Sequence, residues 1–127
     1  GDTPAKAAID VTIHVHSGTR DEEYLKKLRK GLDAAFSACK PDVIYYNAGT
    51  DILEGDPLGL LNVSPAGVIK RDEIVFQYAI ERSIPIVMVL SGGYQRCNAG
   101  VIAQSIRNLQ TKFGVFGGSP KKPTATL

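Results

Sequence analysis

Three short segments of the chain have the apolar pattern of β-strands. Residues 11–15 alternate between apolar and polar side chains through Val11, Ile13 and Val15, which predicts a strand with one buried face. Residues 42–47 ("DVIYYN") and 84–90 ("IPIVMVL") are continuous apolar runs instead. Such runs, rich in β-branched and aromatic residues, are typical of strands that are covered on both faces.

A helical pattern follows the first of these segments. Residues 19–40 begin with Thr19 and Glu22 at the spacing of a capping box, and Pro41 marks the end of the segment. Four apolar side chains fall on one helical stripe, which we expect to be buried: Leu25, Leu28, Leu32 and Phe36.

Two more helices are predicted after the second and third strands. Ser64 and Pro65 have the residue types preferred at an N-cap and at the first helical position, and this helix should run to about Arg82. Its expected buried residues are Val68, Val75 and Ala79. The last helix carries Ile102, Ile106 and Leu109, and Gly114 is its expected C-cap.

Strands that alternate with helices predict an α/β fold with parallel strands and right-handed crossovers. The loops that follow Asn47 and Leu90 both leave the carboxyl ends of their strands. They should therefore emerge at the same edge of the sheet, where ligands bind in open α/β folds. This topology predicts that Asp51, Asp56 and Tyr94 converge.

The first of these loops, "NAGTDILEGDPLG", holds Asp56 between Gly55 and Pro57. Gly55 permits unusual backbone angles and Pro57 fixes the following one, so such a loop can aim the carboxylate, and a carboxylate oxygen is a ligand for Zn²⁺. The alternative is an Asx-type turn, in which the carboxylate accepts hydrogen bonds from nearby amides, and the loop alone favours this turn. For Asp51 we expect a supporting role, either binding backbone amides or pairing with a cation.

The second loop contains "SGGY", in which Gly92 and Gly93 allow a ligand to approach the backbone closely. The hydroxyl of Tyr94 could donate a hydrogen bond to a developing oxyanion. A tyrosine packed on the sheet edge is one alternative. A phosphate-binding loop is another, but neither a GxGxxG motif nor a P-loop lysine follows.

Composition limits the class of protein. With 127 residues, 43% of them hydrophobic, the chain can form one domain with a real core, which we place at residues 1–116 with a flexible tail at 117–127. A formal charge of +2 argues against a nucleic-acid or membrane surface, and no apolar run approaches the roughly 20 residues needed to cross a bilayer. Two cysteines form no disulfide framework, which indicates a reducing compartment.

Other polar residues have simpler explanations. His14 and His16 share one face of the first predicted strand, and without a third ligand nearby we expect that face to be solvated. Cys97 is expected to be an ordinary free thiol, since no base is evident beside it.

Together, "PDVIYYNAGTDILEGDPLGLLNVSPAGVIKRDEIVF" and "IPIVMVLSGGYQ" resemble the carboxyl-terminal half of a class IV histone deacetylase. The similarity is clear from Gly18 to about Leu109. It implies the three-layer α/β/α arginase/deacetylase fold with a parallel sheet, of which this chain would be the C-terminal half. It also implies a location in the nucleus or cytoplasm and zinc-dependent hydrolysis of Nε-acyl-lysine on histone tails or other proteins.

The resemblance also assigns roles to residues. Asp56 would be one of three protein ligands of the catalytic zinc, and Tyr94 would polarise the acyl carbonyl and stabilise the oxyanion. Gly92 and Gly93 would line the channel for the acyl-lysine side chain. In this family a pair of histidines and an Asp-x-His element complete the site, and all of them lie upstream of the matching segment.

We therefore expect an enzyme only as part of a complete domain, with the missing N-terminal half as partner. The isolated chain should neither hold zinc tightly nor hydrolyse acyl-lysine. The alternative is a catalytically inactive deacetylase-like module that acts as an interaction surface. A flavodoxin-like nucleotide binder is disfavoured, because no phosphate-loop signature is present.

Overall fold

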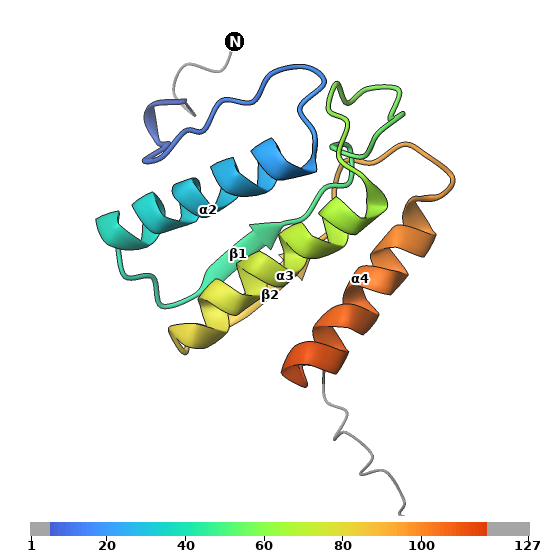
Figure 1. The fold of residues 1–127 in the computed structure, drawn as a ribbon. Coiled ribbons are helices and arrows are strands. Elements are labelled where there is room, and N and C mark those ends of the chain that lie inside the picture. The colour runs from blue at the N-terminus through green and yellow to red at the C-terminus, as the bar shows by residue number, and fades with distance from the viewer. Residues whose placement is uncertain (1–5, 117–127) are drawn as a thin grey trace, which may run out of the picture.

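The structure, a computed structural model, describes residues 6–116, so the predicted tail at 117–127 lies outside the described residues. Helices and strands alternate along the chain (Figure 1). They are α2 (Asp21–Ala38), β1 (Ile44–Asn47), α3 (Pro65–Glu81), β2 (Ile86–Val89) and α4 (Asn98–Phe113). None of the helices in this part of the chain is both long and apolar enough to cross a membrane.

The two strands form a parallel pair, as the alternation predicted. Ile44 lies opposite Ile86 and Asn47 lies opposite Val89, with α3 as the crossover between the strands. The predicted α/β class with a parallel sheet is therefore confirmed.

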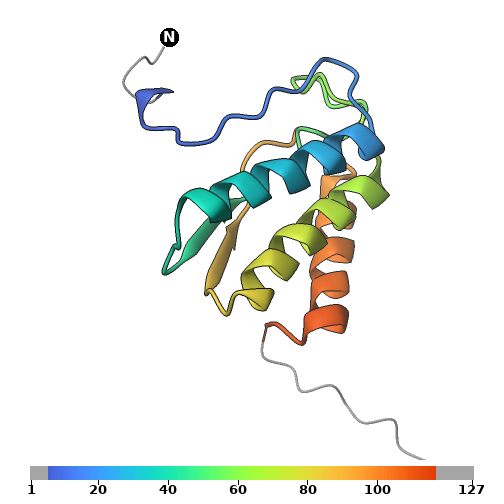
Figure 2. The ribbon, with the colours of Figure 1, turned by 60° about the vertical axis from the view of Figure 1, so that its left-hand side comes forward.

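One face of this sheet is open, contrary to the expectation of strands covered on both faces. Tyr45 is 73% exposed and Val87 is 49% exposed, while their neighbours Tyr46 and Met88 are half-buried. Figure 2 shows the strands at the left, with α3 and then α4 to their right. Within residues 6–116, no element covers the face that carries Tyr45.

The predicted strand at 11–15 is wrong. These residues are extended but make no strand pairing in the described part of the chain. Their apolar side chains instead line one wall of a groove along α2, opposite Leu28 and Leu32. The alternating pattern reflects this one-sided contact with a helix.

The start of α2 also differs from the prediction. Thr19 does not cap the helix, because its hydroxyl donates to the carbonyl of His16 at 2.8 Å, and the N-cap is Arg20 without a side-chain hydrogen bond. The predicted apolar stripe is half-buried, and no residue of α2 is fully buried.

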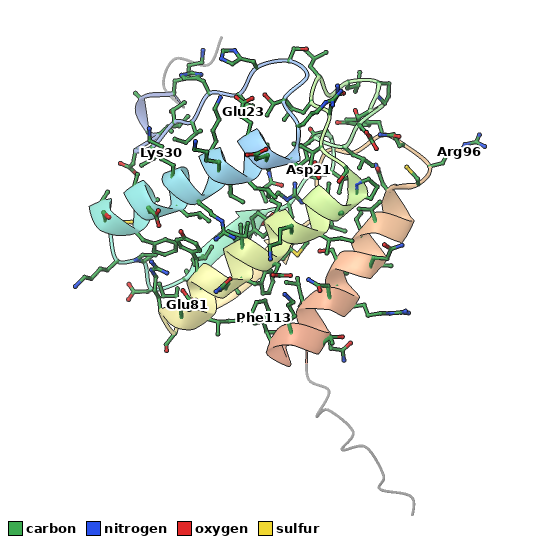
Figure 3. All side chains as sticks on the ribbon, viewed as in Figure 1. Asp21, Glu23, Lys30, Glu81, Arg96 and Phe113 are labelled. Atoms are coloured by element: carbon green, nitrogen blue, oxygen red, sulfur yellow. The ribbon has the colours of Figure 1, made fainter. Side chains whose placement is uncertain are left out.

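The start of α3 is as predicted. Ser64 is the N-cap, and its hydroxyl oxygen accepts the amide of Gly67 at 3.0 Å. Asp21, in the first turn of α2, accepts the backbone N–H of Ser64 at 2.7 Å and also its hydroxyl. Figure 3 shows Asp21 between the starts of these two helices. The first turns of α2 and α3 are thereby fixed to each other.

The core lies where α3, α4 and the loop after β1 meet. Leu53, Val63, Val68 and Val101 form its buried cluster. Val68, Val75 and Ala79 are buried as predicted, and Gly114 caps α4 with φ of 64°. The buried stripe of α4 is displaced from the predicted one, since Ile106 is 40% exposed. It consists of Asn98, Val101, Ser105 and Leu109.

Candidate functional site

The loops that follow β1 and β2 lie side by side at one end of the molecule, as Figures 1 and 2 both show. Backbone hydrogen bonds continue beyond the strands, from Ala48 N to Val89 O at 2.8 Å and from Thr50 N to Gly92 O at 2.6 Å. The predicted convergence of the two loops is confirmed.

Asp56 is the residue that connects the loops most directly. It is buried, and its Oδ1 accepts the amides of Leu58 at 2.9 Å and Gly59 at 2.8 Å. Its Oδ2 accepts the amide of Tyr94, in the other loop, at 2.9 Å. The Asx-type turn is thus present, and the same carboxylate also holds the backbone of Tyr94.

These contacts set the charge state of Asp56. Burial raises the pKa of this carboxyl, but the amide donors of Tyr94, Gly59 and Leu58 together lower it by more. The net pKa is therefore below its ordinary value. Asp56 is therefore an anion at neutral pH. A carboxylate offers about four lone-pair positions. Three are used here, which leaves one position on Oδ2 for a further ligand.

Glycines allow the two loops to approach this closely. A Cβ on Gly93, which has φ of +138°, would lie 2.0 Å from Thr50 Oγ1. A Cβ on Gly92 would lie 2.3 Å from Asp51 Oδ2, so the Asp51 carboxylate packs directly against this loop. Asp51 thus lies between the two loops, and its supporting role stays a prediction.

The side chain of Tyr94 is 58% exposed, so it is not packed on the sheet edge. Arg96, two residues further, points away from both loops in Figure 3. Cys97 is an exposed free thiol. His14 and His16, in the segment before α2, are exposed, as expected of a solvated face.

The site offers one coordination position to a metal. Within residues 6–116 there is no group of three or more His, Cys, Asp or Glu side chains that could hold a metal ion. The free position on Asp56 Oδ2 fits a single bond to Zn²⁺, which prefers four ligands. The other ligands of a zinc site would come from outside the described residues.

Sequence reasoning missed a buried polar network beneath the first loop. Arg71 and Asp72 of α3 are 4% and 1% exposed, and Nε of Arg71 donates to Oδ1 of Asp72 at 2.8 Å. Tyr46 and Ser105 also donate to this carboxylate, both at 2.6 Å. The signal in the sequence was spacing, since Asp72 stands four residues after Val68 and three before Val75.

Asn98, at the start of α4, was missed as well. It is 7% exposed, and neither its side-chain nitrogen nor its oxygen has a hydrogen-bond partner among the described residues. Its Nδ2 would lie 2.7 Å from a Cβ on Gly93, so the amide group packs against the glycine pair.

Comparison with known proteins connects this arrangement to a family. Residues 2–110 match the family model of the histone deacetylase domain. The chain is 53% identical over 108 residues to Histone deacetylase 2 of Arabidopsis thaliana, covering 85% of this chain and 28% of that protein. It is 26% identical over 88 residues to Histone deacetylase 8 of Xenopus tropicalis, covering 69% of this chain and 23% of that protein.

A solved structure agrees. The crystal structure of the HDA15 HD domain matches with a TM-score of 0.63 and 25% identity, covering 79% of this chain and 28% of that chain. The chain therefore spans less than a third of the relatives that it matches. On the family match over residues 2–110 and the shared fold, the chain belongs to the histone deacetylase family.

Proposed function

We propose that this chain is the carboxyl-terminal part of a class IV, zinc-dependent lysine deacylase that hydrolyses Nε-acyl-lysine on histones or other proteins in the nucleus or cytoplasm. Family membership supports a deacetylase-type hydrolase. The observation that carries the proposal is the contact between the loops, in which the Asp56 carboxylate holds the Tyr94 amide and keeps one lone pair free.

In this proposal Asp56 is one of the zinc ligands, through the free position on Oδ2. A bound zinc ion acts as a Lewis acid and lowers the pKa of a bound water. Asp56 fits that task because three amides hold it in place and its lowered pKa keeps it ionised. Asp51 supports the site by packing between the loops.

Tyr94 is the proposed catalytic residue of this chain. Its phenol O–H donates a hydrogen bond to the acyl oxygen as that oxygen gains negative charge in the transition state. Gly92 and Gly93 line the channel for the acyl-lysine side chain. The exposure of Tyr94 supports this role, since its side chain is accessible to a substrate.

The test uses a protein that carries the complete deacetylase domain and an acyl-lysine peptide. Tyr94→Phe should lower kcat by about 10²-fold or more while zinc content stays unchanged, because one oxyanion donor is lost. Asp56→Asn should lower zinc content, because a charged ligand becomes a neutral amide. Equal turnover of wild type and Tyr94→Phe would refute the role of Tyr94.

A second candidate is a catalytically inactive module that binds another protein. The exposed apolar side chains of Tyr45 and Val87, which lie opposite each other on the open sheet face, favour it. This reading predicts that a protein carrying the complete domain lacks deacylase activity even when loaded with zinc. The same activity measurement therefore separates the two candidates.

A further inference from the structure

We propose that Arg71 is a positioning residue, which fixes the backbone at Ala48–Gly49 and thereby sets the position of Asp56 relative to Tyr94. This inference rests on the proposed function for its catalytic meaning. The geometric part concerns this chain alone and is tested separately.

Arg71 is placed to hold the carboxyl end of β1. Its Nη1 donates to the carbonyl of Gly49 at 2.5 Å, and its Nη2 donates to the carbonyl of Ala48 at 3.3 Å. The side chain is 5% exposed, so these bonds form away from competing water. A single guanidinium thus binds two successive carbonyls at the point where the strand becomes the loop.

The guanidinium is itself held in a fixed orientation. Nε of Arg71 donates to Asp72, whose carboxylate also accepts Tyr46 from β1 and Ser105 from α4. The guanidinium carbon lies 5.7 Å from the centre of the Tyr46 ring. Burial raises the pKa of Tyr46, so its phenol stays protonated and donates to Asp72. Three elements therefore orient Arg71.

The held segment is the one on which both loops depend. Thr50, next to Gly49, donates its amide to Gly92 O at 2.6 Å, and a Cβ on Gly49 would lie 3.3 Å from Gly92 N. Movement at Ala48–Gly49 would therefore separate the Asp56 carboxylate from the Tyr94 amide.

The substitution Arg71→Lys tests this placement. It keeps the positive charge, but a single nitrogen cannot reach Asp72 and both carbonyls together. Hydrogen exchange of individual amides, measured by NMR on the 127-residue chain, should accelerate about tenfold or more at Thr50 and Tyr94. Each rate is corrected for the free energy of unfolding of the variant.

Glu73→Gln is the matched control. Glu73 lies on the same helix and binds Lys70 and Lys112, and within residues 6–116 it makes no hydrogen bond or ion pair with either loop. The corrected exchange rates at Thr50 and Tyr94 should stay within about threefold of wild type. Equal acceleration in both variants would overturn the proposal, because it would reduce Arg71 to a general stabilising residue.

If Arg71→Lys does not fold, Asp72→Asn, which keeps Arg71 itself, serves as the second variant. It keeps the shape of the side chain and weakens the bond to Nε from charge-assisted to neutral. Exchange at Thr50 should then accelerate about threefold, and an unchanged rate would overturn the proposal.

Activity provides the second readout. In a protein with the complete domain, Arg71→Lys should lower kcat about tenfold with KM little changed, whereas Glu73→Gln should leave both unchanged. An unchanged kcat in Arg71→Lys would overturn the catalytic part of the inference. A wild-type domain without deacylase activity would refute the proposed function, while the exchange rates would still decide the role of Arg71.

Discussion

At the scale of single residues, two glycines seven positions apart, Gly93 and Gly100, provide opposite tests. A Cβ on Gly93 would collide with Thr50 and Asn98, at a φ of +138° that L side chains rarely adopt. Gly93→Ala should therefore lower the free energy of unfolding by at least about 2 kcal/mol. A Cβ on Gly100, within α4, would meet nothing within 4 Å. Gly100→Ala should raise stability by about 0.5 kcal/mol through helix propensity.

Urea denaturation of the two variants measures both effects. If Gly93→Ala were as stable as wild type, the close packing between the "SGGY" loop and Thr50 would be wrong, and with it the way the two loops are joined.

The site residues show what sequence can predict at this scale. The acidic and glycine-rich composition of the first loop predicted the Asx-type turn at Asp56, because that turn depends on local sequence. The additional bond to the Tyr94 amide could not be read from the loop. It depends on how the loop after β1 and the loop after β2 are positioned relative to each other, which local sequence does not specify.

At the scale of elements, Glu73 makes a group of polar contacts that join α3 to α4. Its carboxylate accepts Lys70 and Lys112, and also Asn108 at 3.0 Å. Burial raises the pKa of Glu73, but these donors lower it by more, so that the pKa falls to about 2. Because the pKa is lowered in the folded state, the stability that the Glu73 carboxylate contributes is fully present above its ordinary pKa of about 4.3. It is lost as the pH falls towards about 2.

Glu73→Gln should therefore lower the free energy of unfolding by about 1 kcal/mol at pH 7, with a smaller difference from wild type near pH 2. Thermal unfolding across this pH range measures it. Glu23→Gln is the control, because Glu23 forms an exposed i,i+4 pair with Lys27 on α2 and should leave the stability almost unchanged. A pH-independent difference for Glu73→Gln would contradict the assignment of the charge.

Among the elements, the sequence predicted correctly those features that depend on local residue preferences and on the order of strands and helices. The cap at Ser64 and the parallel pair of strands follow from local residue preferences and topology. The strand at 11–15 failed because alternation reports a one-sided apolar contact, and here the contact is a helix. Arg71 and Asp72 were missed because a charged pair in a helix ordinarily faces water.

At the scale of the whole molecule, the open face of the sheet is an exposed apolar surface. Side chains of Tyr45 and Val87 are exposed on neighbouring strands. Exposed apolar strands of this kind promote association between molecules. The chain spans less than a third of its relatives, and under the proposed function further parts of the domain would cover this face.

The double substitution Tyr45→Lys and Val87→Lys should therefore act in opposite ways in two proteins. In the 127-residue chain it should reduce self-association, measured by sedimentation velocity, with a loss of stability of about 1 kcal/mol or less, because these side chains contact solvent and the two opposed lysines repel each other weakly. In a protein with the complete domain it should lower stability by several kcal/mol, because two charges would be buried without partners. The control is Ile106→Lys, at a side chain of α4 that is 40% exposed, and it should be tolerated both in the 127-residue chain and in the complete domain. If the double variant were equally harmless in both proteins, the face would be free in the complete domain, and the interaction module would become the better account of it.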